Sequence, residues 1–348
     1  TLTAPDAGAR QIAVEGNDGY RLWLDGAVVI DRWFKRSYGR QSVAVDFAPG
    51  THHELRLEFF ESTGNARVKL LWDAGAPNTT DAGRRAIDDA VALTRTSDAA
   101  VIVAGLEEGE FRDRAFIALP GLQEDLITAV AATGTPVVVV LVGGSAVGMS
   151  RWIDHVDAVV DAWYPGEQGG HGVADVLFGD ANPAGRLPVT FAMSEGQLPL
   201  SYDHRPTGRG DDYLDLTGMP LFPFGHGLSY TTFAYSDLAI SPDHASADDT
   251  ITVSCTVTNT GTRIGDEVVQ LYVRDVLASL ARPVMSLKGF TRVQLAPGES
   301  TTARFTLTRE SLRMLDAKMQ WVVEPGEFRI LVGASSEDIR LRGTLTVR

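Results

Sequence analysis

The spacing of apolar residues changes twice along this chain, and these changes limit the folds that it can adopt. Over residues 10–75, apolar and polar side chains alternate, and Asp-Gly and Pro-Gly pairs interrupt the alternation, as at 21–26, 43–47 and 55–59. A period of two that is broken in this way predicts antiparallel strands joined by tight turns, and about five strands fit this stretch. Trp23 and Trp72 occupy alternating positions there, and we expect both in the core.

Between residues 82 and 200, the pattern switches to continuous apolar runs separated by helical spacing. The runs are typical of parallel strands that are buried on both faces, and they lie at 99–105, 136–142 and 158–162. Helices are predicted at 83–95, with Asp81 as the N-cap, at 122–132 and at 168–179. This order predicts an open α/β layer, in which ligands bind beyond the carboxyl ends of the strands.

From residue 236 onwards the alternation returns, with turn signals about every 8–12 residues, which predicts an immunoglobulin-like sandwich. Cys255 lies in one of the predicted strands and is expected in the core. The expected fold is therefore multidomain α/β plus all-β, with an open α/β sandwich layer flanked by a partial β-domain and an immunoglobulin-like β-sandwich. The expected segments are a β-domain, the α/β layer, an ordered linker and the sandwich, at 1–78, 79–200, 201–235 and 236–348.

Charge and composition exclude several classes of function. The chain has 31 Lys and Arg against 45 Asp and Glu, a formal net charge of −14 that argues against general nucleic-acid binding. No apolar run approaches the ~20 residues that span a bilayer, so we expect no membrane partner. The single cysteine excludes an intrachain disulfide, and the seven scattered histidines include no metal-binding pair, so neither metal nor cofactor is expected.

The densest polar cluster follows the first apolar run of the α/β zone. It holds three glutamates, Glu107, Glu108 and Glu110, close to Arg112 and Arg114. Neighbouring like charges and partial burial raise the pKa of a glutamate, as a general acid near neutral pH requires. The alternative is a solvated surface loop with local ion pairs, and composition alone favours that alternative.

Two glycine-rich stretches, 143–145 and 166–172, also follow predicted strands. Neither matches the phosphate-binding patterns GxGxxG or GxxxxGK[ST], which argues against a nucleotide-binding protein. Ser145 is not in a GxSxG elbow, because Val147 stands where the second glycine would be, so a serine hydrolase is not expected. We expect these glycines to allow tight turns and close packing.

Four sequence blocks resemble glycoside hydrolase family 3. They are GLEEGEFRDRAFIALPG (105–121), VVVVLVGGSAV (137–147), AWYPGEQGGHGVADVLFGDANPAGRLPVTF (162–191) and FPFGHGLSYTTF (222–233), in the order that family members carry them. Further blocks, such as VTNTG and RPVMSLKGF, resemble the fibronectin type III-like domain that ends many members. The segment GNDGYRLWLDGAVVIDRW (16–33) resembles the latter half of a protective-antigen-like domain that some members insert.

The resemblance implies that β-glycosidic bonds are cleaved with retention by two carboxylates. An Asp nucleophile would come from an N-terminal TIM-like barrel, and a Glu acid/base from the α/β layer. The family pattern places this Glu just before an Asp-Arg segment, which makes Glu110 the first choice and Glu108 the second, while Glu107 stays open. Asp113 and Arg114 are then expected to hold the loop.

The resemblance also suggests aromatic residues that contact the substrate. The inserted domain can overhang the leaving-group side of the sugar pocket in relatives. Trp33, Phe34 and Tyr38 lie in a less periodic loop of this domain and are candidates for that contact.

We therefore expect the C-terminal portion of an exo-acting β-glycosidase, with β-glucosidase as first choice, that acts on oligosaccharides or aryl β-glycosides. No Ser-Asp-Trp-like nucleophile block is found, so a barrel-bearing partner chain or fragment is expected to be needed for activity, and Thr1 is expected to follow a break within the β-domain. The alternative is a non-catalytic carbohydrate-binding or scaffolding protein, which would not need an acid carboxylate in the 107–114 loop. A homo-oligomer, and a cytoplasmic, periplasmic or secreted location, are all compatible with this interpretation.

Overall fold

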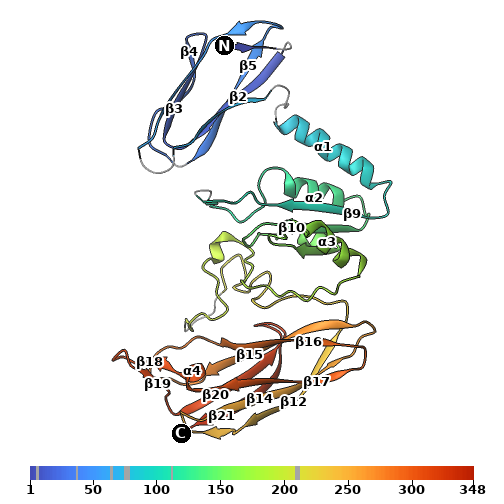
Figure 1. Ribbon diagram of the computed structural model, residues 1–348, viewed down its shortest axis with the longest axis vertical. Coiled ribbons are helices and arrows are strands. Elements are labelled where there is room, and N and C mark those ends of the chain that lie inside the picture. Colours follow the sequence, from blue (N-terminus) through green and yellow to red (C-terminus); the bar gives the residue numbers. More distant parts are fainter. Residues whose placement is uncertain (5–7, 37, 63–65, 74–78, 111–112, 208–211) are drawn as a thin grey trace. The chain divides into compact units, whose positions relative to one another are not determined.

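The structure is a computed structural model, and it describes residues 1–348 except 5–7, 37, 63–65, 74–78, 111–112 and 208–211 (Figure 1). The described residues form two compact units. One unit comprises residues 1–115, 120–143 and 155–159, and the other comprises 116–119, 144–154 and 160–348. None of the described helices is both long and apolar enough to cross a membrane.

The N-terminal region contains two three-stranded antiparallel sheets. One has the order β5-β2-β8, with β5 at Gly39–Phe47, β2 at Gly8–Gly16 and β8 at Val68–Asp73. The other has the order β4-β3-β7, with β4 at Ala27–Arg32, β3 at Gly19–Leu24 and β7 at Leu55–Phe60. The two-residue strands β1 (Leu2–Thr3) and β6 (His52–His53) pair with each other. One shared core joins both sheets, and it contains Ile12, Val14, Tyr20, Leu22, Leu24, Ile30 and Phe47.

The alternating pattern predicts the antiparallel strands of this region, but the structure has seven strands from β2 to β8 where about five were expected, and one tryptophan was placed on the wrong face. Trp72 is partly buried and packs edge-on against Phe47 of the core, with ring centroids 5.4 Å apart, as expected. Trp23 does not join the core, because Leu22 and Leu24 on either side of it are the residues that face inwards. Its ring lies on the opposite face of β3, where the Arg56 guanidinium sits 4.6 Å from the ring centroid.

The α/β layer follows in the order that the sequence predicts. Strands β9 (Ala100–Gly105) and β10 (Val137–Val142) pair in parallel, and with β11 (Ala158–Asp161) they form a sheet of order β11-β10-β9. The helices are α1 (Thr79–Thr94), α2 (Gln123–Ala131) and α3 (Gly169–Phe178), with a short 3-10 turn, η1, at Ile153–His155. Helix α1 begins at Thr79, four residues earlier than predicted, so Asp81 lies inside the helix and is not its N-cap.

The expectation that β9 is buried on both faces is wrong for the unit that contains it. Ile102 and Ala104 are buried, whereas Val101 is 52% and Val103 69% exposed. Helix α2 packs against β9 and β10, and α1 packs against α2. Alternate residues of β9 therefore differ in exposure. The sequence could not predict this difference, because an apolar run does not reveal whether one or both faces of a strand are covered.

The C-terminal region is a β-sandwich. Its smaller sheet has the order β12-β14-β17, with bounds Phe233–Ser241, Ile251–Asn259 and Ser300–Leu307. Its larger sheet has the order β13-β21-β20-β15-β16, with bounds His244–Ala245, Ile339–Val347, Gly326–Gly333, Gly265–Asp275 and Ser286–Leu295. The short elements α4, β18 and β19 lie at Arg309–Leu312, Met314–Leu315 and Trp321–Val322. Cys255 is 1% exposed in the shared core, as expected.

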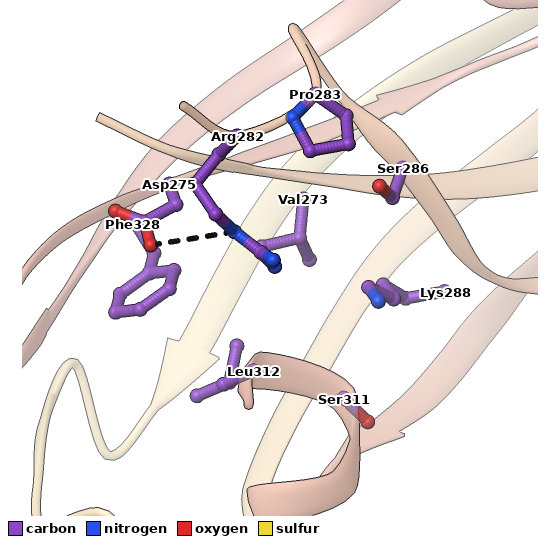
Figure 2. A pocket seen from close by; sticks show the side chains of 9 residues that line it. All are labelled: Val273, Asp275, Arg282, Pro283, Ser286, Lys288, Ser311, Leu312 and Phe328. Carbon is purple, nitrogen blue, oxygen red and sulfur yellow. Dashed lines mark ion pairs between the residues drawn. The ribbon is translucent and has the colours of Figure 1, made fainter. Parts of the chain in front are cut away.

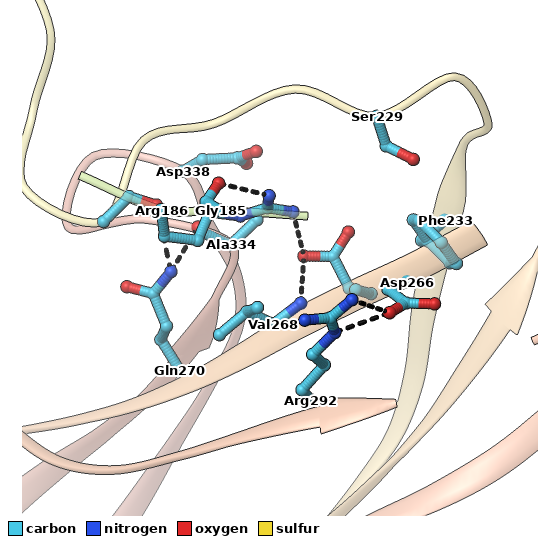
Figure 3. Close-up of polar contacts among 12 residues, drawn as sticks. Gly185, Arg186, Ser229, Phe233, Asp266, Val268, Gln270, Arg292, Ala334 and Asp338 are labelled. Carbon is cyan, nitrogen blue, oxygen red and sulfur yellow. Dashed lines mark hydrogen bonds and ion pairs between the residues drawn. The ribbon is translucent and has the colours of Figure 1, made fainter. Parts of the chain in front are cut away.

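Polar contacts fix the chain that precedes the sandwich onto its larger sheet (Figure 3). The Arg186 Nη2 atom lies 3.1 Å from Glu267 Oε1, and both side chains are more than nine-tenths buried. The Gln270 Nε2 group donates to the carbonyl of Gly225 over 3.1 Å and to that of Ala334. Tyr202 stacks on Phe224 with ring centroids 4.2 Å apart. The aperiodic residues that enter the sandwich are therefore ordered by side chains of the strands that follow them.

Candidate active site

The carboxyl end of β9 is held by one side chain of helix α2. Gly105 is the last residue of β9, and its N–H donates to Gln123 Oε1 over 2.7 Å. The Gln123 amide donates in turn to the carbonyl of Gly105 at 3.0 Å and to that of Pro120 at 3.1 Å. A side chain at position 105 would not fit, because a Cβ atom there would lie 2.0 Å from the Val142 carbonyl oxygen. This brace fixes the point from which the acidic loop starts.

The three candidate glutamates follow directly on this brace. Leu106 donates its N–H to the Val142 carbonyl at 2.9 Å, and the next residues leave the sheet without regular structure. Glu107 and Glu110 are exposed, and Glu108 is half-buried. The structure thus brings all three carboxylates to the carboxyl end of a parallel strand, which is where such sheets bind their ligands.

The loop-supporting residues lie just beyond. Asp113 is exposed and Arg114 is half-buried, while Arg112 falls outside the described residues. The residues that follow are anchored within the second unit: the Ile117 N–H donates to Glu195 Oε1 at 2.7 Å, and the Gly148 N–H donates to the Ile117 carbonyl at 2.9 Å. Glu195 belongs to a short 3-10 turn, η2 (Glu195–Gln197), and no local sequence pattern marks it as a functional residue.

A further carboxyl group ends strand β11. Asp161 Oδ1 accepts the Trp163 N–H at 3.2 Å, and burial raises the pKa of Asp161 above its usual range. Trp163 has a φ of +51°, a strained backbone conformation for a large side chain. A titratable group with a shifted pKa at the end of a parallel strand is a candidate for function, and the apolar run that predicts β11 gives no sign of it.

Glycines near these strand ends allow close packing, as expected from the sequence. A Cβ atom on Gly144 would lie 2.3 Å from the aromatic ring of Tyr164. The glycine therefore lets the Tyr164 ring pass against the backbone after β10. In the part of the chain that the structure describes, no group of three or more His, Cys, Asp or Glu residues is arranged to hold a metal ion.

The aromatic candidates of the N-terminal region lie on its surface loop. Trp33 is 39% and Phe34 51% exposed, and Tyr38 is half-buried. The Trp33 ring packs edge-on against Phe60, with centroids 4.9 Å apart, and the Arg21 guanidinium lies 5.0 Å from the Trp33 centroid. One exposed indole is therefore held in place by an aromatic ring and a cation.

Comparison with known protein families gives the affiliation of this fold. The glycosyl hydrolase family 3 C-terminal domain matches residues 7–230, and a fibronectin type III-like domain matches residues 267–336. The first match takes in the N-terminal sheets and the α/β layer with its acidic strand-end loop, and the second lies within the sandwich. The chain belongs to glycosyl hydrolase family 3.

Curated relatives and solved structures agree with this affiliation. The periplasmic β-glucosidase of Salmonella typhimurium is 42% identical over 344 residues, which cover 90% of this chain and 44% of that protein. A β-xylosidase of Formosa agariphila is 43% identical over 268 residues, covering 75% of this chain and 37% of the relative. A β-glucosidase structure from Kluyveromyces marxianus in complex with glucose matches with a TM-score of 0.74 and 27% identity, over 100% of this chain and 44% of that one. The chain therefore spans less than half the length of each of these relatives.

Proposed function

We propose that this chain forms the acid/base-bearing part of a retaining, exo-acting β-glycosidase, with terminal β-linked glucose as the first-choice sugar. The observation that carries the proposal is the position of Glu107, Glu108 and Glu110 at the braced carboxyl end of β9. The names of the relatives, β-glucosidase and β-xylosidase, support the substrate class.

Glu110 is the proposed acid/base, and Glu108 is the second choice. A general acid has to reach the leaving-group oxygen of a bound sugar, and the exposed Glu110 side chain is accessible in this way. Glu108 is half-buried and interacts with its surroundings, which suits a residue that shapes the loop. Asp113 and Arg114, which follow Glu110 in the chain, are proposed to hold the end of the loop.

The second carboxylate of the reaction is proposed to come from a barrel-bearing segment or partner chain. Retaining glycosidases place a nucleophile and an acid/base roughly 5–5.5 Å apart, so that one attacks the anomeric carbon while the other protonates the leaving oxygen. The relatives, which are about twice as long as this chain, leave room for such a segment. Trp33, Phe34 and Tyr38 are proposed to contact the leaving-group side of the substrate.

Reconstitution tests the proposal. The 348-residue chain is assayed alone and together with the barrel-bearing segment, on aryl β-glucosides and aryl β-xylosides. Activity is expected only for the combination. Glu110→Ala in the combination should regain turnover of activated aryl glycosides when azide is added, because azide attacks the glycosyl-enzyme without a general base, releases the enzyme carboxylate and leaves as a glycosyl azide. Glu107→Ala is the matched control from the same loop, and it should keep its activity without azide.

Two results would refute this assignment. Turnover by the isolated chain would show that the barrel nucleophile is not needed. Binding of oligosaccharides without turnover by any combination would instead favour a non-catalytic carbohydrate-binding protein.

A further inference from the structure

A small pocket lies in the β-sandwich (Figure 2). Val273 on β15, Leu312 at the end of α4 and Phe328 on β20 form its apolar wall. Its free space is about 10 Å³, close to the roughly 10–15 Å³ that one water-sized group needs. The pocket can therefore take one polar atom of a ligand, while the rest of that ligand would stay at the surface.

The polar side chains of the pocket are mainly donors. Arg282, Lys288, Ser286 and Ser311 line it together with a single carboxylate, that of Asp275. The Nε atom of Arg282 is buried and has no hydrogen-bond partner, and it lies 3.9 Å from Asp275 Oδ2, beyond hydrogen-bond distance. A buried guanidinium N–H without an acceptor is costly, so this group calls for a ligand atom.

Lys288 adds a second positive charge to the pocket, next to the Arg282–Asp275 ion pair. Its side chain is half-buried, and no hydrogen bond or ion pair joins it to any residue that the structure describes. Burial and the nearby Arg282 charge lower the pKa of Lys288 below its usual range. Two positive side chains thus share a confined space. This arrangement is unfavourable without an anion, because like charges repel each other and a buried charge is costly unless it is paired.

The carboxylates near the pocket do not balance these cations. Asp275 also accepts a backbone hydrogen bond from Leu277, and burial raises its pKa. Glu324, the next carboxylate, is engaged by both the N–H and the hydroxyl of Ser279. Ser311 Oγ accepts the Thr308 N–H, so its own O–H remains available as a donor.

We propose that this pocket binds one oxygen of a small oxyanion, with Lys288 and Arg282 as charge partners and the hydroxyls of Ser286 and Ser311 as further donors. Cationic side chains pair with oxyanions through short, charge-assisted hydrogen bonds. The ligand chemistry is shared by inorganic phosphate and by carboxylates. The site is independent of the proposed glycosidase activity, because none of its residues belongs to the acidic loop.

Phosphate titration of the full chain tests the proposal. Inorganic phosphate is added at constant ionic strength, with chloride as the balancing salt, and the amide signals of residues 286–289 and 311–312 are followed by NMR. Saturable shifts confined to these residues are expected with phosphate and not with chloride. Equal responses to both salts would overturn the proposal, since they would reflect charge screening alone.

Matched variants locate the binding groups. Lys288→Met should weaken phosphate binding at least tenfold, whereas Lys318→Met, which removes an exposed lysine of the same sandwich, should leave it unchanged. Arg282→Gln, with the exposed Arg304→Gln as its control, repeats the test without changing Lys288. Unchanged affinity in both pocket variants would overturn the proposal. Displacement of phosphate by acetate would extend the site to carboxylates, and its absence would limit the ligand to phosphate-like anions.

Discussion

Gln123 should control the order of the acidic loop, because it is the brace at the end of β9. The Gln123→Ala variant removes three hydrogen bonds, two to Gly105 and one to Pro120. A typical protein hydrogen bond contributes about 1 kcal/mol net, and these groups are partly exposed, so the local cost is about 2–3 kcal/mol. At about 1.4 kcal/mol for each factor of ten, this raises local opening about 30- to 150-fold.

Hydrogen–deuterium exchange measures this effect where it occurs. The peptide that covers residues 105–110 should exchange faster in Gln123→Ala by that factor, while the strands of the sandwich keep their protection. Thr128→Ala removes one hydrogen bond to the Glu124 carbonyl on the same helix and is the control. In Gln123→Glu, the exchange rate of this peptide should lie between those of Gln123→Ala and Thr128→Ala, because a carboxylate can accept from the Gly105 N–H but cannot donate to the two carbonyls. Protection that changes less than threefold in Gln123→Ala would refute the brace.

Three further predictions concern side chains within the sandwich or in the chain that precedes it. Arg186→Met should destabilise the protein by about 3–5 kcal/mol in chemical denaturation, because it leaves the Glu267 carboxylate buried without its partner, whereas Arg186→Met with Glu267→Leu should recover most of this loss. Burial raises the pKa of Cys255 to about 11, so a thiol reagent at pH 8 should label it only when the protein unfolds, and rapid labelling of the native protein would contradict its position in the core. Burial and the Arg186 charge lower the pKa of His226 below its usual value of about 6.5, so the contribution of the neutral His226 to stability should be fully present above pH 6.5 and be lost as the pH falls below it. Thermal stability measured against pH should therefore decrease less steeply below pH 6.5 in His226→Gln than in the wild type, and equal slopes would contradict this role.

The strand and helix order could be predicted because each element has a strong local pattern. The apolar run of β10 (Val137–Val142) and the alternation of β14 (Ile251–Asn259) state their element type without any partner. Face assignment is harder. Leu22, Trp23 and Leu24 are three consecutive apolar residues, so the alternation does not say whether Trp23 or its neighbours face the core.

The candidate site was predictable only in part, for a related reason. The acidic loop is visible because its carboxylates are adjacent in the sequence and follow a strand. Gln123 and Glu195 act on backbone groups 18 and 78 residues away, and a single sequence holds no signal for such long-range hydrogen bonds. The raised pKa of Asp161 likewise depends on burial, which arises from tertiary packing.

The assignment of Glu110 as the acid/base is the central claim, and leaving-group dependence tests it most directly. kcat/KM is measured for a series of aryl β-glucosides of increasing leaving-group pKa, using the chain combined with its barrel-bearing segment and the variants Glu110→Gln, Glu108→Gln and Glu107→Gln. A general acid contributes roughly 100- to 10,000-fold, so Glu110→Gln should lose about that much with the poorest leaving groups and little with the most activated ones. We expect kcat/KM to fall steeply with leaving-group pKa in Glu110→Gln and in neither of the other two variants. A shallow fall in Glu110→Gln, or a steep fall in Glu108→Gln, would contradict the assignment.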